Sequence, residues 1–261
     1  MVLEKLVSLR VAIKQPAWMI LIGGIVPVVC LTVSYMIFEA SVGLITNFLI
    51  TIAMTPFMLN LISYEETKEE ERIKSKRDLS FFQRHGDILK IYTAFFCGMI
   101  LSFSILYIIL PDSMSEKIFN DQINQINAIR GNIASPDTFF KIIVNNVGVL
   151  ILSFLLSFIF GAGAIFLLSW NASVLATAIG SLAKQSGGIK GLPLAILPFL
   201  PHGSLEILAY FIGGIAGGLV SVSITRRKSL GFWFILKDSL KLMAVSVILL
   251  VFAGLIEITM L

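Results

Sequence analysis

Long apolar runs constrain this chain more than any other feature of its sequence. Several runs reach the roughly 20 residues that an α-helix needs to cross the hydrocarbon core of a bilayer. Of the 261 residues, 57% are hydrophobic and only 14% are charged, whereas soluble domains carry about 25% charged residues. The sequence therefore predicts an all-α fold, a polytopic transmembrane helical bundle in the plasma membrane. Continuous apolar runs exclude a β-barrel, whose short strands alternate in polarity.

Six clear spans are expected from the apolar runs: residues 17–38, 41–62, 91–110, 142–168, 205–224 and 239–258. Basic residues precede the first run, as in a secretory signal peptide. That run is too long for a signal peptide and contains no cleavage site of small residues. An uncleaved first span is therefore predicted.

The chain divides into three regions. Residues 1–62 are interpreted as a basic lead and a transmembrane hairpin, and residues 63–90 as a cytoplasmic charged helix that ends near Gly86. Residues 91–261 form the predicted transmembrane core. Within it, residues 112–140 carry isoleucines at roughly helical spacing. We expect an external amphipathic helix there, lying on the membrane or on a partner.

The basic residues predict the orientation. Residues 1–16, 64–90 and 226–241 hold three, seven and five of the twenty Lys and Arg residues, and residues 111–141 hold three. Because basic loops stay in the cytoplasm, a cytoplasmic N-terminus and an external C-terminus are expected. The net charge of +4 reports this orientation, and no nucleic-acid partner is expected.

The orientation requires one further crossing. The span that ends near Leu168 finishes inside, and the span that finishes before Arg226 must begin outside. The chain must then cross between Ser169 and Leu200, where two short apolar pieces flank a glycine-rich stretch. The sequence predicts a broken or re-entrant crossing, which is tolerated in a membrane only when protein or a cavity surrounds it.

Residues 192–224 combine a proline-broken apolar run with an ionisable pair. A helix beginning at Pro201 would place His202 and Glu206 one turn apart on one face, and we expect the two to interact. Paired glycines follow at G-x-x-x-G spacing, which favours close helix packing: Gly213, Gly214, Gly217 and Gly218.

Asn145, Asn146, His202 and Glu206 are all expected near the outer ends of their helices, where they could form one polar cluster. Ionisable residues within spans are functional candidates because charge is costly in lipid. A structural role, in which Glu206 caps its helix or bonds a neighbour, is equally compatible with the sequence. For the two asparagines, hydrogen bonding between helices is the favoured interpretation. His85 is interpreted as solvated.

The sequence contains no recognised catalytic arrangement. A nucleotide-binding loop, an H-E-x-x-H motif and a G-x-S-x-G elbow are all absent. His202 and Glu206 alone are too few ligands for a zinc site, and Cys30 and Cys97 fall within predicted spans as small apolar residues. No catalytic residue, cofactor or metal is expected, and the protein is predicted not to be an enzyme.

Several of these residues together carry a family resemblance. Asn145-Asn146, Gly161-x-Gly163, Asn171 and Pro201-His202-Gly203-x-x-Glu206 resemble the stage II sporulation protein M family over about residues 140–225. The first 140 residues look like the longer, non-sporulation members of that family in archaea and other prokaryotes. The resemblance implies a membrane protein without established catalysis. In endospore formers, the member is similar to an anchor that recruits cell-wall-degrading enzymes.

Three functions are compatible with the sequence. The leading hypothesis is a membrane scaffold that recruits other membrane or envelope proteins through residues 64–90 inside and 112–140 outside. The second is a permease or channel-like subunit, in which the broken crossing and the His202–Glu206 pair line a path. An intramembrane enzyme ranks third. The bilayer is the one partner that composition itself predicts, and the oligomeric state is left open.

Overall fold

The computed structural model describes residues 8–75, 81–133, 138–225 and 232–260. Over these ranges the chain consists of helices joined by turns, and seven segments are long and apolar enough to cross a membrane. The predicted all-α polytopic bundle is therefore confirmed. The long helices are α3 (Ala17–Ile37), α4 (Val42–Ser75), α5 (Phe81–Ile109), α8 (Thr138–Phe160), α9 (Ala164–Gln185), α11 (Leu200–Thr225) and α12 (Phe232–Met260).

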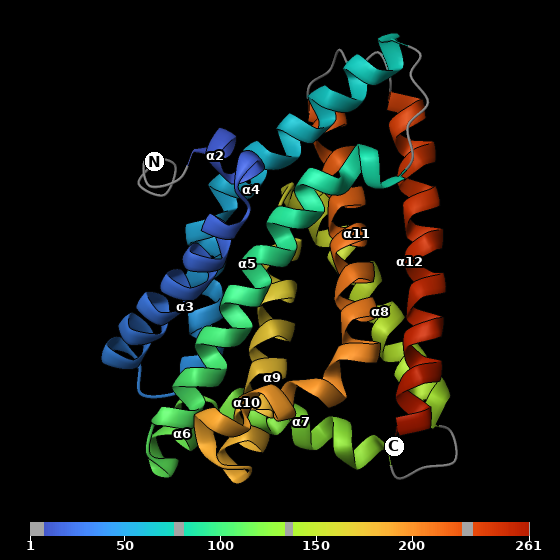
Figure 1. Ribbon diagram of the computed structural model, residues 1–261. Coiled ribbons are helices and arrows are strands. Elements are labelled where there is room, and N and C mark those ends of the chain that lie inside the picture. The colour runs from blue at the N-terminus through green and yellow to red at the C-terminus, as the bar shows by residue number, and fades with distance from the viewer. Residues whose placement is uncertain (1–7, 76–80, 134–137, 226–231, 261) are drawn as a thin grey trace.

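Shorter helices lie at the two ends of the bundle (Figure 1). The α2 end holds α2 (Leu9–Lys14), where α4 finishes and α5 and α12 begin. The α7 end holds α6 (Asp112–Ile118), α7 (Asn120–Ile133) and α10 (Leu192–Ile196), together with the 3-10 turns η1 (Gly188–Gly191) and η2 (Leu197–Phe199). The carboxyl end of α12 also lies there (Figure 1).

Helix α11 belongs to the most deeply buried of the candidate spans. Every residue from 209 to 220 is buried, which is expected only of a helix enclosed on all sides. Its most extensive contacts are with α12 and α8. A second group of helices forms where α5 packs against α3 on one side and α9 on the other.

Glycines set the closest approach between α11 and α8. A Cβ atom added at Gly217 would overlap the carbonyl oxygen of Phe154, and one at Gly213 would overlap the side chain of Leu150. At Gly218, an added Cβ would lie 2.7 Å from the carbonyl oxygen of Gly161. The glycine face of α11 therefore lets backbone touch backbone, which is how apolar helices gain contact in lipid.

A similar contact joins α3 to α5. A Cβ atom at Gly23 would overlap the carbonyl oxygen of Phe95, and one at Gly98 would overlap that of Ile20. These two glycines lie on opposite helices of the same crossing. They anchor the amino-terminal hairpin directly on the core.

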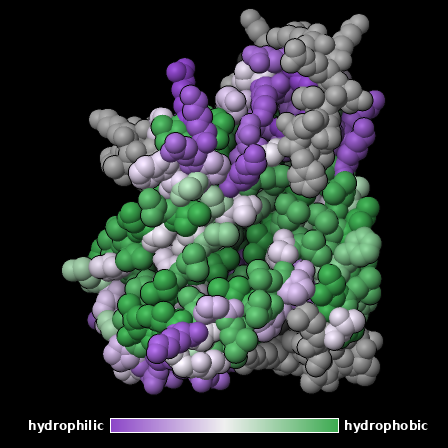
Figure 2. All heavy atoms as spheres, viewed as in Figure 1, coloured by the Kyte–Doolittle hydropathy of each residue, from purple (hydrophilic) through white to green (hydrophobic). Residues whose placement is uncertain are grey.

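The outer surface of the bundle is apolar between two polar ends. Figure 2 shows this as a hydrophobic belt with hydrophilic residues gathered above and below it. Large apolar side chains such as Ile25, Met36, Ile159 and Phe252 are more than half exposed. A soluble monomer rarely exposes so large an apolar patch, so this belt is the surface that contacts lipid.

The predicted broken crossing between Ser169 and Leu200 is wrong. Helix α9 runs unbroken over 22 residues from Ala164 to Gln185 and is itself a complete candidate span. The helix before it ends at Phe160 instead of Leu168, because Gly161 adopts a φ of +74° and reverses the chain. The amide of Ala164 then donates to the Ser157 hydroxyl of α8 at 3.0 Å, which satisfies one of the amides left free at the start of α9.

The glycine-rich stretch and the prolines Pro193 and Pro198 lie at the α7 end, before α11 begins. Gly187 and Gly188 have φ values of +106° and +70° and end α9. Pro193 and Pro198 stand in the first turns of α10 and η2, where a missing amide proton does no harm. These prolines therefore start the short helices that lead into α11.

The charged region does not form a helix of its own. Helix α4 continues from the hydrophobic core to Ser75, and α5 begins at Phe81 with Gly86 inside it. The two helix ends carry acids and bases toward each other, so that several of these side chains are buried.

The apolar side of the amphipathic segment predicted over residues 112–140 packs, where the structure describes it, against the bundle. Ile118 and Phe119 are almost fully buried, and Ile123 packs against the same core. The Phe119 ring lies 5.4 Å from that of Tyr107 and 6.1 Å from that of Phe103. At Ile118, Phe119 and Ile123 this apolar side is therefore covered by the chain itself.

We expect Gly217→Ala to destabilise the protein by about 1–3 kcal/mol, because the added methyl group meets α8 backbone that cannot rotate away. Thermal unfolding in mild detergent, followed by circular dichroism, measures the change. Gly148→Ala is the matched control, since a Cβ there meets nothing within 4 Å. Equal effects of the two substitutions would contradict the role assigned to the α8–α11 contact.

Candidate functional site

A cluster of amides and carboxylates links α8, α11 and α12 near the α7 end. The Asn146 side-chain amide on α8 donates a 2.7 Å hydrogen bond to the Glu206 carboxylate on α11. The side-chain amide of Asn145 donates in turn to the side-chain oxygen Oδ1 of Asn146 at 3.2 Å. Asn146 is buried, whereas Asn145 is exposed. Three of the four residues of the predicted polar cluster thus form one hydrogen-bonded chain.

Glu257 of α12 completes this cluster, which we call the amide–carboxylate cluster: Asn145, Asn146, Glu206 and Glu257. Glu257 lies near Glu206 and Tyr210 of α11 and forms no recorded hydrogen bond with either of these described residues. Two carboxylates from different helices therefore lie near one another, and one of them has an amide donor. The arrangement can bind helices together, and it can also attract a proton or a small cation.

His202 does not join the cluster. It lies in the first turn of α11, as expected, but the structure records no hydrogen bond or ion pair between it and Glu206. Its Nδ1 atom is buried without a hydrogen-bond partner, and its ring lies 6.4 Å from that of Phe199. The expected His202–Glu206 interaction is therefore wrong, because Asn146 from another helix occupies the carboxylate.

A second polar site lies at the α2 end and joins α4, α5 and α12. We call it the charge network, and it consists of Glu65, Glu69, Arg72, Arg84, His85 and Asp238. The Glu69 carboxylate accepts from Arg72 at 2.8 Å and from Arg84 at 3.2 Å. Arg84 also pairs with Asp238 of α12. One carboxylate on α4 and one on α12 are thus bridged by a single guanidinium group.

His85 belongs to this network, and the interpretation of a solvated residue is wrong. Its side chain is 1% exposed, with Nδ1 3.0 Å from the Glu65 carboxylate and Nε2 3.7 Å from that of Asp238. The imidazole thus lies between an acid of α4 and an acid of α12. Buried ionic groups of this kind persist only where the geometry supplies each charge with partners.

The rim of the network is more exposed. Lys68 pairs with Asp87 at 2.8 Å, and each side chain is about one-third exposed. The Arg72 guanidinium lies 4.9 Å from the centre of the Phe234 ring.

Among the described residues, no three His, Cys, Asp or Glu side chains are arranged to hold a metal ion.

Comparison with known proteins identifies the family. The family model of stage II sporulation protein M matches residues 91–260. The chain belongs to the stage II sporulation protein M family. An uncharacterised protein of Methanocaldococcus jannaschii is 33% identical over 126 residues, which cover 46% of this chain and 68% of that protein. No solved structure matches the chain.

Part of the charge network lies inside the residues that match the family, and part precedes them. Asp238 lies within the matched residues, while Glu65, Glu69 and His85 precede them. The network therefore fastens the amino-terminal helices of this chain onto the stage II sporulation protein M core. The amide–carboxylate cluster, by contrast, lies wholly within the match.

Some residues that carried the family resemblance lie outside the amide–carboxylate cluster, in α9 and in the first turn of α11. Asn171 bonds back to the carbonyl oxygen of Leu167 within α9 at 2.8 Å. Pro201 is exposed in the first turn of α11, where its missing amide proton is tolerated, and Gly203 is buried beside it. Asn171 belongs to the first half of α9 and does not contact Glu206.

Sequence reasoning missed the charge network because its partners are far apart in the chain. Arg84 and Asp238 are separated by 154 residues. One signal was present: Glu65, Glu69 and Arg72 recur at four and three residues and so share a helix face. A face of acids that continues a membrane span is not simply solvated when another helix covers it.

We predict that Asn146→Ala and Glu206→Gln are non-additive, with a coupling of about 0.5–3 kcal/mol, because they share one hydrogen bond. Unfolding in detergent of the two single variants and the double variant measures it. His202→Ala combined with Glu206→Gln is the control cycle, and it should be additive within about 0.5 kcal/mol. Strong coupling in the control would restore the pair expected from the sequence.

Asp238→Asn should destabilise the protein by about 3–5 kcal/mol, because Arg84 and His85 would lose a buried acidic partner. The same change at the exposed pair, Asp87→Asn, should alter stability by about 0–1 kcal/mol. Both variants are compared by thermal unfolding in one detergent. Similar small effects would mean that the network contributes no more than a surface ion pair.

Proposed function

We propose that this protein is a membrane scaffold that recruits partner proteins at its α7 end and catalyses no reaction of its own. The observation that carries the proposal is the position of α7. This helix is held rigidly against the bundle by its apolar and polar anchors, and it exposes an uncharged amide face.

Two side chains fix α7 to different helices. The Asp121 carboxylate accepts a 3.1 Å hydrogen bond from the backbone amide of Leu44, in the first turn of α4. The Gln122 amide donates to the Ser173 hydroxyl of α9 at 3.2 Å. Gln122 is almost fully buried against Gly43, which leaves room for it. The helix is thus attached to α4 and α9 by polar contacts as well as by its isoleucines.

The opposite side of α7 is polar and nearly uncharged. Its exposed residues include Asn120, Asn124, Gln125 and Asn127. A helix that lies on a membrane presents Lys and Arg on its polar face and inserts its apolar face into lipid. Here Ile123 of the apolar face packs against the core of the same chain. A rigid surface of hydrogen-bonding amides suits a protein partner better than a lipid surface.

The family and the orientation agree with this role. Under the positive-inside expectation, α7 lies outside the cell, on the side where envelope proteins are found. The resemblance to a family with a member that anchors envelope enzymes supports the same side and the same role. The identity of the partner in this protein does not follow from that resemblance.

Transport is the weaker alternative. It depended on a broken crossing and on a His202–Glu206 pair, and the structure contains an unbroken α9 and an Asn146–Glu206 bond instead. The glycine contacts also close α11 onto α8 along the middle of the bundle. The amide–carboxylate cluster is the one feature that still favours transport.

The test is quantitative co-purification from native membranes in mild detergent. We expect the unaltered chain to retain specific proteins, and Asn124→Arg with Gln125→Arg to retain at least tenfold less of them, because two charges would enter the contact surface. Gln185→Arg is the matched control, since Gln185 is also exposed and lies at the same end. It should retain the partners.

Two results would contradict the scaffold. Equal retention by the double variant and the control would mean that α7 is not the recruiting surface. Solute flux through proteoliposomes of the purified chain, with no protein retained, would favour the transport alternative.

A further inference from the structure

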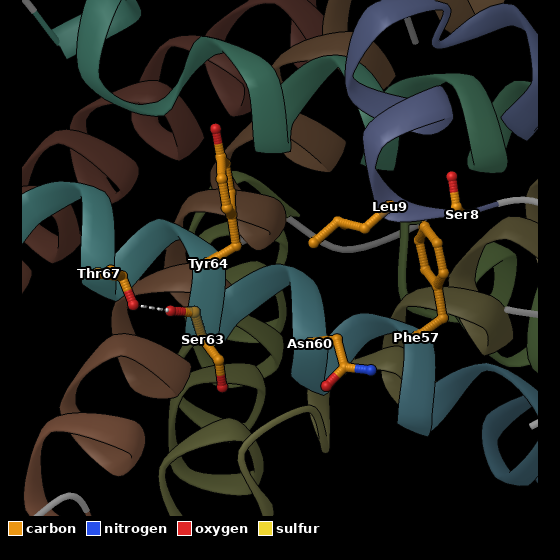
Figure 3. A pocket seen from close by; sticks show the side chains of 7 residues that line it. All are labelled: Ser8, Leu9, Phe57, Asn60, Ser63, Tyr64 and Thr67. Carbon is orange, nitrogen blue, oxygen red and sulfur yellow. Dashed lines mark hydrogen bonds between the residues drawn. The ribbon is translucent and has the colours of Figure 1, made fainter.

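A cleft opens between α2 and α4 at the α2 end of the bundle (Figure 3). Its volume is about 430 Å³, within the roughly 300–1,000 Å³ typical of ligand pockets. The lining residues are Ser8, Leu9, Phe57, Asn60, Ser63, Tyr64 and Thr67. Neither the amide–carboxylate cluster nor the α7 surface contributes to it.

The lining changes from apolar to polar along α4. Phe57 and Leu9 supply the apolar part, and Asn60 and Ser63 follow with an amide and a hydroxyl. Thr67 ends the series, ten residues or roughly 15 Å of helix beyond Phe57. The Ser8 hydroxyl also lines the cleft, beside Phe57 (Figure 3). A ligand that fills this cleft must therefore combine apolar and hydrogen-bonding groups.

Aromatic residues place the cleft at the membrane surface. Tyr64 is 38% exposed, and Trp18, at the start of α3, is 46% exposed. The Trp18 indole donates to the Gln15 side chain at 3.0 Å. Exposed Trp and Tyr side chains with a polar partner mark the level of the lipid headgroups. The molecule that is always present at that level is a phospholipid.

The charges around the cleft favour an anionic lipid. Arg10 and Lys14 are exposed on α2, whereas Lys68 of α4 is already paired with Asp87. The nearby acids Glu65 and Glu69 are buried in the charge network and point away from solvent. Basic residues at this level attract acidic headgroups.

We propose that the α2–α4 cleft binds an anionic phospholipid, with its phosphate near the Tyr64 hydroxyl and its glycerol backbone beside Asn60 and Ser63. The acyl chains continue past Phe57 along the apolar surface of the bundle. The hydroxyl and amide groups select a headgroup, and the cations of α2 select its charge.

Native mass spectrometry of the full chain, released from detergent after titration with phosphatidylglycerol, tests the proposal. We expect one retained lipid at low lipid concentration, with much weaker retention of phosphatidylcholine. Arg10→Gln and Lys14→Gln should each weaken retention about fivefold. Lys141→Gln is the matched control, because Lys141 is exposed at the opposite end of the bundle, and it should leave retention unchanged.

Ser63→Phe tests the cleft itself, since the larger ring fills it. This variant should lose the lipid while its thermal unfolding without added lipid stays close to that of the unaltered chain. If it is unstable, Ser63→Ala, which should weaken retention several-fold, takes its place.

Three outcomes would overturn the proposal. One is equal retention of both lipids with no effect of Arg10 or Lys14. Another is full retention by the cleft variants. The third is displacement of the lipid by millimolar inorganic phosphate, which would identify a small-anion site instead.

Discussion

Lipid removes the force that sorts apolar side chains into the interior of a soluble protein, and the structure of this bundle depends on that constraint. An apolar side chain is equally well placed against lipid or against another helix. Helices α3, α8 and α12 accordingly turn much of their apolar surface outward. Two kinds of contact decide which helix faces point into the bundle. One is close backbone contact at glycines, such as Gly217 against Phe154, and the other is a small number of polar links between side chains. Both contacts require particular residues at particular positions.

This constraint explains how much of the fold the sequence could predict. Hydropathy reports solvent preference, so it identified the spans and the membrane class. It did not separate α8 from α9, because the turn at Gly161–Gly163 contains no polar residue and lies within one apolar run. A positive φ at Gly161 is a property of the backbone, and it leaves no trace in hydropathy. The extra crossing required by the basic residues does exist, but it begins at Ala164.

The candidate sites could likewise be predicted only in part from the sequence. Helical spacing placed His202 and Glu206 on one face, yet spacing does not decide which side chain finds a partner on another helix. Glu206 bonds Asn146, which lies 60 residues away, and His202 bonds neither. Depth alone was enough to place Asn146 and Glu206 at the same level. The pairing of Arg84 with Asp238 joins segments whose relative position only the folded chain reveals.

Polar links stand at opposite ends of the bundle. At the α2 end, Asp238 of α12 pairs with Arg84 of α5, and near the α7 end, Asn146 of α8 donates to Glu206 of α11. Between these links α12 packs along α11, whose glycine face is closed on α8. Moving the beginning of α12 would break a buried charge contact, and separating α8 from α11 would leave a partly buried carboxylate without its donor, and both changes are costly. The bundle that carries α7 is therefore held at both ends. A scaffold needs this property, because a partner bound at one end must find the same surface each time, whatever the surrounding lipid does.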